Sequence, residues 1–345
     1  VCLLIWISSS ILAVSAKINL ACSTNTSPIC VGVTGFFVRS KRMTSKSFSS
    51  FFICILKVGC VTKHFSAASE KDWCWANDTI YSSGSSASGA DVINGGSGAD
   101  DVLSFKNETE GIRIDLDESA SQDTNVGNVI VSNIENIEGS NQNDVIFGTS
   151  VTDNDLYGLD GNDSLVGRTG NDSLFGGTGN DTFKVSLGDG NDLIDGFELD
   201  GSNAAQTDID DASNKDTVDF SAITGSYRAN VDLSNTSSAN AIVTDGTTTN
   251  QSNTLRNIEN IIGTNNNDTL TGNAESNTLE GGAGNDTLIG NAGADNLQGG
   301  TGDDEFKGSE FTGDVINGGS GSETAGDTVV YTDVTSKIKV DLEEN

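Results

Sequence analysis

The chain has 345 residues, and 50 acidic residues against 18 basic ones give it a formal net charge of −32. Residues 1–80 carry 8 Lys/Arg and 3 Asp/Glu (+5), whereas residues 81–345 carry 10 Lys/Arg and 47 Asp/Glu (−37). So large an acidic excess argues against a nucleic-acid partner, whose phosphates require Lys and Arg, and against an anionic membrane surface. We therefore expect no nucleic-acid binding and no membrane insertion by the acidic part, and we place a boundary between residues 80 and 81.

Residues 1–80 differ in composition from the rest, with all six Cys, all three Trp and the only Pro, Met and His. Val1–Ala16 is apolar but shorter than the roughly twenty residues of a membrane helix, and it resembles the apolar part of a secretory signal. A second signal-like segment begins at Met43. Alternatively, residues 1–42 lie upstream of the true start. We expect a poorly ordered, signal-like or non-native segment without an assignable disulfide framework.

Residues 81–200 form a first predicted module of nine-residue units. One isolated unit, GGSGADDVL, spans Gly95–Leu103, and an array runs from Gly139 to about Asp195. The array includes GLDGNDSLV, GRTGNDSLF and GGTGNDTFK, and it ends in LGDGNDLID. Between them, residues 113–116 alternate polar and apolar side chains, which predicts a half-buried strand.

Residues 201–313 form a second predicted module, in which Gly263–Lys307 holds five uninterrupted units: GTNNNDTLT, GNAESNTLE, GGAGNDTLI, GNAGADNLQ and GGTGDDEFK. Each begins with Gly, four carry Asp at the sixth place, and all carry Leu or Phe at the eighth. A period this short indicates a repeat architecture rather than a globular core. Residues 201–215 and 234–253 are polar and are expected to be loops.

Longer segments also recur. Asp91–Gly96 recurs as Asp314–Gly319, and Ile-Glu-Asn-Ile occurs at 134–137 and at 258–261. Residues 314–345 are therefore predicted to begin a third module. Because no array follows, we expect the chain to be a fragment that is truncated at its C-terminus.

The residue types of the nine-residue unit indicate which ligand it binds. Its glycines permit positive φ, so that carbonyls can converge in a tight turn, and the sixth-place Asp adds a carboxylate. An oxygen-only donor set suits Ca²⁺, and the acidic part contains no Cys or His that would favour zinc or copper. One inward Leu per unit contributes about 1.5–3 kcal/mol, against backbone ordering of about 1–2 kcal/mol per residue. Bound cations must supply the remaining stabilisation.

These units resemble the GGxGxDxUx pattern of RTX (haemolysin-type) calcium-binding repeats. The resemblance covers residues 91–345, and it implies an all-β fold, a parallel β-roll in which two nonapeptides form one coil and several Ca²⁺ ions lie between stacked turns. The carboxylate ligands that it implies are Asp100, Asp144, Asp163, Asp172, Asp181, Asp192, Asp268, Asp286, Asp295 and Asp304. The turn glycines that it implies are Gly96, Gly98, Gly177, Gly179, Gly282, Gly284, Gly300 and Gly302.

The resemblance also predicts how the units stack. Alternate units should bring Asp163 onto Asp181, and Asp268 onto Asp286 and Asp304. Asn154 and Asn277 stand where the pattern has Asp, so weaker cation sites are expected there. The alternative is that some of these Asp residues only cap turns through local hydrogen bonds.

No HExxH motif, no GxSxG elbow and no credible Ser-His-Asp triad occurs, so the chain is not expected to be an enzyme. The first functional hypothesis is a secreted or cell-surface calcium-binding protein with a structural or adhesin-like role and a cell-surface or matrix partner. The second is the calcium-binding, export-related part of a secreted enzyme (protease, lipase or alginate epimerase) whose catalytic domain lies outside this chain. Both predict folding that is driven by extracellular calcium.

Overall fold

A computed structural model of the chain describes residues 79–81, 90–197, 214–235, 239–308, 313–321 and 324–331. All of them belong to one compact unit that begins at residue 58. The predicted signal-like segments and the six Cys lie outside the described residues. The described part of the chain holds no helix long and apolar enough to span a bilayer. The module boundaries at 80/81, 200/201 and 313/314 stay predictions.

The described residues form 25 short strands in three sheets. The 13-stranded sheet contains, in spatial order, β1 (Thr79–Tyr81), β3 (Val102–Ser104), β7 (Asn136–Glu138), β9 (Asp155–Asp160), β11 (Ser173–Thr178), β13 (Leu193–Asp195), β17 (Thr249–Arg256), β16 (Ala239–Thr244), β15 (Arg228–Asp232), β19 (Thr269–Thr271), β21 (Thr287–Ile289), β23 (Glu305–Gly308) and β25 (Thr328–Tyr331). The nine-stranded sheet contains β24 (Val315–Gly319), β22 (Asn296–Thr301), β20 (Thr278–Ala283), β18 (Asn260–Ile262), β14 (Thr217–Asp219), β12 (Thr182–Lys184), β10 (Ser164–Val166), β8 (Val145–Phe147) and β4 (Arg113–Asp115). The third sheet contains β2 (Asp91–Asn94), β6 (Asn128–Ser132) and β5 (Gln122–Asp123).

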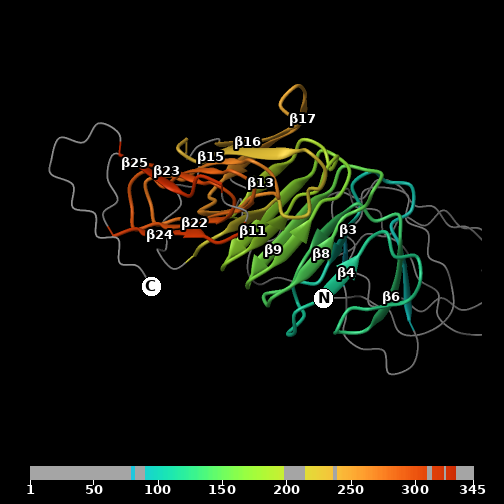
Figure 1. Ribbon diagram of the computed structural model, residues 1–345. Helices are drawn as coiled ribbons and strands as arrows, with labels where there is room; N and C mark the ends of the chain where they lie inside the picture. Colours follow the sequence, from blue (N-terminus) through green and yellow to red (C-terminus); the bar gives the residue numbers. More distant parts are fainter. Residues whose placement is uncertain are drawn as a thin grey trace, which may run out of the picture. The chain divides into compact units, whose positions relative to one another are not determined.

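Within the arrays, successive strands alternate between the two large sheets. Ser164 of β10 pairs in parallel with Thr182 of β12, and Thr269 of β19 pairs with Thr287 of β21, each 18 residues further along. Two nonapeptides therefore make one coil. Strands β9, β11 and β13 follow one another across one sheet in Figure 1. The predicted all-β fold with long parallel sheets is confirmed, and it is consistent with a β-roll.

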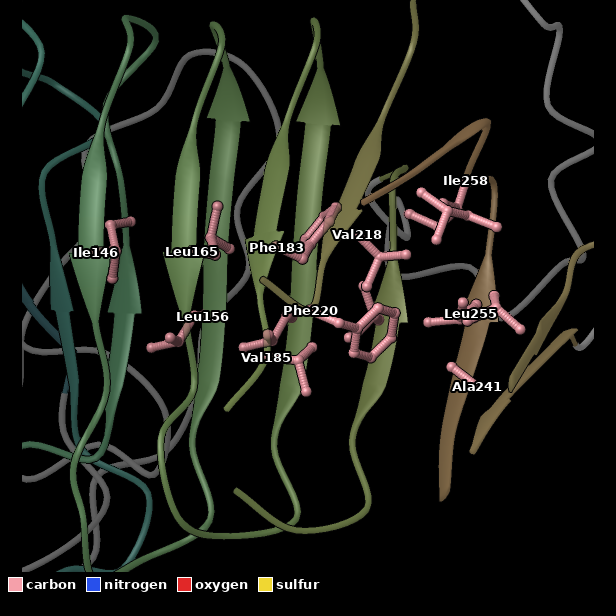
Figure 2. Close-up of a cluster of buried hydrophobic side chains, with 14 of the residues drawn as sticks. Ile146, Leu156, Leu165, Phe183, Val185, Val218, Phe220, Ala241, Leu255 and Ile258 are labelled. Carbon is pink, nitrogen blue, oxygen red and sulfur yellow. The ribbon is translucent and has the colours of Figure 1, made fainter. Parts of the chain in front are cut away.

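The eighth residue of each unit forms the core between the sheets. Leu165, Phe183, Leu288 and Phe306 are all fully buried. In the nine-stranded sheet, Ile146, Leu165, Phe183 and Val218 follow one another from strand to strand (Figure 2). Because the sheets are parallel and in register, one apolar residue per unit suffices to make a continuous apolar row.

The predicted loop at 234–253 is wrong. Strands β15, β16 and β17 form an antiparallel meander that lies in the large sheet between β13 and β19. Ala239, Ala241 and Val243 are buried, and the residues between them face outward. Two of these three inward residues are small, so the segment has a polar average composition although every second residue packs inside. The strand predicted at 113–116 is confirmed as β4.

The first glycine of each unit is required by space rather than by backbone conformation. A Cβ on Gly158 or Gly176 would lie 2.2 Å from Oδ2 of the Asp five residues later, and on Gly299 the distance would be 2.1 Å. None of these three glycines has a positive φ. The turn therefore folds back until its carboxylate lies against its own first residue.

This packing predicts the effect of Gly176→Ala. The new Cβ would overlap Oδ2 of Asp181, so we expect a loss of about 3 kcal/mol in the free energy of unfolding in saturating calcium. Gly188→Ala is the matched control, since Gly188 has a φ of +87° but open space around it, and it should cost about 1–2 kcal/mol from backbone strain alone. Denaturant unfolding followed by circular dichroism measures both. Equal losses in the two variants would contradict the space argument.

Candidate metal-binding turns

Nine of the ten predicted carboxylate ligands are buried. At most 5 % of each residue is exposed, and the nine are Asp144, Asp163, Asp172, Asp181, Asp192, Asp268, Asp286, Asp295 and Asp304. Each lies at the end of a turn, directly before a strand. Buried carboxylates are rare unless they are paired or bound to a cation, so their regular recurrence points to a site of some kind.

The buried carboxylates form ladders from coil to coil. Oδ1 of Asp163 accepts the backbone N–H of Asp144 at 2.7 Å, and the N–H of Asp163 is donated to Oδ1 of Asp181 at 2.7 Å. Oδ1 of Asp286 likewise accepts the N–H of Asp268, at 2.7 Å, and the N–H of Asp286 reaches Asp304 at 2.9 Å. The structure thus brings together the Asp pairs that the resemblance to RTX repeats predicts.

In several of the buried carboxylates, the second oxygen has no hydrogen-bond donor among the described residues. For Asp163, Asp172, Asp181, Asp286 and Asp295, Oδ2 is buried and accepts no hydrogen bond from any residue that the structure describes. A desolvated anionic oxygen without a partner is costly, so each of these turns requires a proton or a cation.

Burial also changes the acidity of these groups. In the metal-free chain it raises the pKa of Asp163 and Asp286 to about 8, although backbone N–H donors oppose the shift. The pKa values of Asp172 and Asp181 rise to about 7, also through burial. For Asp192 and Asp268 burial raises the pKa to about 6. At neutral pH and without a cation, the turns therefore hold carboxyl groups close to their protonation point.

The turn glycines allow the coils to approach closely. Gly179 and Gly302 have positive φ, and a Cβ on them would lie 1.8 Å from O of Gly161 and 2.0 Å from O of Gly284. The other predicted turn glycines with positive φ are Gly96, Gly177, Gly282, Gly284 and Gly300. Gly98 does not share this conformation, but its Cβ would lie 2.8 Å from Oδ2 of Asp101. Backbone carbonyls of adjacent coils thus lie close to these turn glycines.

This donor set fits Ca²⁺. Among the described residues, no three His, Cys, Asp or Glu side chains gather closely enough to hold a metal by themselves. Any cation must therefore take one or two carboxylate oxygens, such as those of Asp163 and Asp181, and complete its shell with turn carbonyls. A shell of six to eight oxygens in flexible geometry is what Ca²⁺ accepts, whereas zinc prefers His and Cys. The individual ligands stay predictions.

The unit at Gly95–Leu103 is displaced by one residue from its predicted register. Asp100 is exposed, whereas Asp101 is fully buried and directly precedes β3. Leu103, rather than Val102, takes the inward place in the core. The sequence offers two adjacent Asp residues, and the pattern match selected the first of them. The structure gives Asp101 the position that Asp163 has in its own turn.

Several members of the ladders lie outside the nonapeptides and were not predicted. Asp216 accepts the N–H of Asp181 at 2.7 Å, and Oε2 of Glu259 accepts the N–H of Asp216 at 2.9 Å. Glu135 does the same for Asp101, at 3.0 Å. The sequence does contain a signal for Asp216, because Asp216-Thr217-Val218 repeats the Asp-Thr-apolar order of the units. The Ile-Glu-Asn-Ile segments place the two Glu residues.

The fifth residue of the unit has a role that was also not predicted. The N–H of Asn162 is donated to Oδ1 of Asn143 at 2.8 Å, and the N–H of Asn180 to Oδ1 of Asn162 at 2.9 Å. The second array repeats this ladder, from the N–H of Asn285 to Oδ1 of Asn267 at 2.9 Å. The amide ladder runs from later to earlier coils, opposite to the carboxylate ladder. Together the two ladders fix the coil spacing from both directions.

Asn154 and Asn277 have a structural reason that the pattern does not show. Nδ2 of Asn277 donates to O of Glu259 at 2.8 Å, and Nδ2 of Asn154 donates to O of Glu135 at 2.6 Å. The backbone N–H of each Glu is already donated to a backbone carbonyl of the preceding coil, from Glu259 to Asp216 and from Glu135 to Asp101. The coil before each Asn thus presents a carbonyl, which an amide can satisfy and a carboxylate cannot.

Asn277→Asp tests this account against the expectation that Asp would improve a weak site. We expect the substitution to destabilise the chain by about 1–3 kcal/mol in saturating calcium, because a carboxylate would face the carbonyl of Glu259. Asn240→Asp, on the exposed side of β16, introduces the same charge and should have little effect. Thermal unfolding measures both variants. A raised midpoint for Asn277→Asp would support the weak-site interpretation instead.

The raised pKa values predict an acid-stabilised metal-free fold. A carboxyl whose folded pKa lies above its unfolded value of about 3.9 adds stability below that value, and it loses this contribution as the pH rises through the folded pKa. With folded values from about 6 to about 8, β-structure in calcium-free buffer should decrease from pH 5 to pH 8. Circular dichroism over this range tests the expectation. Structure that increases with pH in calcium-free buffer would contradict it.

The repeat turns match a known family of calcium-binding repeats. The profile of the RTX calcium-binding nonapeptide repeat matches the chain in four copies, over residues 77–104, 149–183, 262–297 and 289–310. A comparison with curated proteins finds no match. The matched segments contain the isolated unit at Gly95 and units of both arrays. The glycine and aspartate turns within these segments are therefore RTX calcium-binding nonapeptide repeats.

Proposed function

We propose that this chain is a secreted, non-catalytic structural segment whose fold is switched on by extracellular calcium. The observation that carries the proposal is the set of buried carboxylates in which Oδ2 accepts no hydrogen bond from the described residues, at Asp163, Asp172, Asp181, Asp286 and Asp295. A fold that depended on apolar packing alone would have no use for charged groups at these positions, since burying them opposes folding.

The switch follows from the charge. Residues 81–345 sum to −37, so the metal-free chain repels itself, and at neutral pH the turns must either protonate their carboxylates or leave them uncompensated. Ca²⁺ would supply positive charge between stacked turns, where Asp163 and Asp181, or Asp268, Asp286 and Asp304, would hold it with turn carbonyls. Binding to the folded state alone stabilises it by RT ln(1 + [Ca²⁺]/Kd), which is about 1.4 kcal/mol per site when free calcium is ten times Kd.

Location follows from the same requirement. Extracellular calcium modules work with Kd values of roughly 0.1–1 mM, far above cytosolic calcium. In the cytosol the acidic repeats would stay expanded, which suits export, and outside the cell they would fold. RTX repeat proteins are typically secreted, and we extend that location to this chain.

An adhesin-like structural role fits the continuous sheets. The segment from β13 to β19 joins the two arrays without a break in the 13-stranded sheet, through the inserted strands β15–β17. Asp216 and Glu259 carry the carboxylate ladder across the same junction. The acidic part contains no His or Cys, and the buried acids of its repeat turns accept backbone N–H groups in ladders, which supports a role other than catalysis. A cell-surface or matrix partner would then bind the outward faces.

Asp286→Asn tests the proposal because it keeps the acceptor Oδ1 and removes only the charge. In calcium-free buffer the variant should be more stable than the natural chain, since a desolvated charge is gone. In calcium the order should reverse, with the midpoint of a far-UV circular dichroism titration raised about tenfold. Asp155→Asn, on the exposed side of β9, is the matched control and should change neither. Mg²⁺ should not replace Ca²⁺.

Two outcomes would overturn the proposal. One is a natural chain with the same folded spectrum with and without calcium. The other is an Asp286→Asn variant with an unchanged calcium midpoint, which would leave Asp286 as a turn cap only.

A further inference from the structure

Arg168 is a charged residue at a place that the repeat reserves for glycine. It is the second residue of GRTGNDSLF, where Gly177, Gly282 and Gly300 stand in other units. Its φ is +69°, in the left-handed region, which disfavours a side chain with a Cβ. Leu159 has a φ of +82° at the same place of its own unit, so the backbone conformation does not account for an arginine here, and the contacts of its side chain must.

The Arg168 guanidinium contacts oxygen atoms of three residues. Nη1 and Nη2 bond Oδ1 and Oδ2 of Asp115 at 2.7 and 2.8 Å, a bidentate pair. Nη1 also bonds the backbone O of Gly148 at 2.9 Å and lies 3.0 Å from Oδ2 of Asp117. The side chain is only 25 % exposed, and the guanidinium lies 5.4 Å from the ring centroid of Phe147. Charge-assisted, bidentate bonds of this kind are among the strongest in proteins.

These contacts join three successive strands of the nine-stranded sheet. Asp115 ends β4, Gly148 directly follows β8, and Arg168 lies just beyond β10. Ser150, in the turn after β8, also donates its N–H to Asp117 at 3.1 Å. Burial raises the pKa of Asp115, but the hydrogen bonds and charge of Arg168, the N–H of Asp117 and the charge of Arg113 together lower it, so its carboxylate stays charged.

The second array contains a neutral counterpart. Asn291 also stands at the second place of its unit with a positive φ, of +70°. Its Nδ2 bonds the carbonyl of Gly272 at 2.7 Å, as Arg168 bonds that of Gly148. The amide carries no charge, so it cannot compensate carboxylates.

We propose that Arg168 is a built-in counter-ion, which ties strands β4, β8 and β10 together through one carbonyl and two carboxylates without needing calcium. It supplies a positive charge to oxygen donors of the kinds that the repeats offer to Ca²⁺. The first coils of the roll therefore keep their structure at calcium levels at which the second array, residues 263–307, is still open. The inference rests on the proposed calcium-driven folding of the remaining turns.

Hydrogen exchange with mass spectrometry on the whole chain, at stepped calcium concentrations, tests this order. In the natural chain, residues 113–117 and 145–150 should gain protection at lower calcium than residues 287–306. In Arg168→Gly, which restores the repeat's own residue and relieves the backbone strain, protection of the first two segments at low calcium should fall about tenfold. Arg168→Lys should retain part of it, since it keeps the charge but not the bidentate fork.

Lys184→Ala is the matched control. Lys184 is an exposed cation on β12 that forms no ion pair with any described residue, and its loss should leave the exchange pattern unchanged. If Arg168→Gly and Lys184→Ala both match the natural chain, the counter-ion role is refuted. If residues 287–306 of the natural chain are equally protected without calcium, the proposed calcium-driven folding itself fails, so the two failures are distinguishable.

Discussion

Most turns of the arrays hold a carboxylate away from water, and the rest of the structure is arranged around that group. Oδ1 accepts an N–H from the preceding coil, as Asp163 does from Asp144. Oδ2 presses against the first glycine of its own unit, as for Asp163 and Gly158. The geometry is favourable only when the negative charge is compensated, because desolvation of a carboxylate costs several kcal/mol. The buried carboxylate therefore fixes the coil spacing, and it also makes folding depend on compensation of its charge.

Each position of the nonapeptide pattern helps the turn to bury its carboxylate. The first Gly makes room for the carboxylate, and the second and fourth allow carbonyls of adjacent coils to approach. The fifth-place Asn ladder, such as Asn143 to Asn162, holds the outer side of the turn from the opposite direction. The eighth-place Leu or Phe fills the apolar space between the two large sheets. No single position stabilises the roll alone, which is why the unit recurs as a whole.

The period, the glycines and the carboxylates carried the resemblance to RTX repeats, and that resemblance implied the coil of two nonapeptides whose 18-residue register the structure has. Features that depend on a neighbouring coil were not predictable from one unit. Asp101 replaces Asp100 because the chain enters β3 one residue later. The strand β16 was hidden by small inward residues, Ala239 and Ala241. Asn277 looked like a defect because its partner, the carbonyl of Glu259, is 18 residues away.

Charge compensation need not have the same source in every turn. The Asn residues at 154 and 277 remove a charge where the preceding coil offers a carbonyl, and Arg168 supplies a permanent cation beside Asp115. On the proposed function, the fully matching units, such as those that contain Asp181 and Asp286, would rely on an external cation. In a repeat fold each coil contacts mainly its neighbours, so a coil held by fixed charges lowers the cost of adding the next. The sequence departures at Asn154, Arg168 and Asn277 would then set where calcium is needed along the roll.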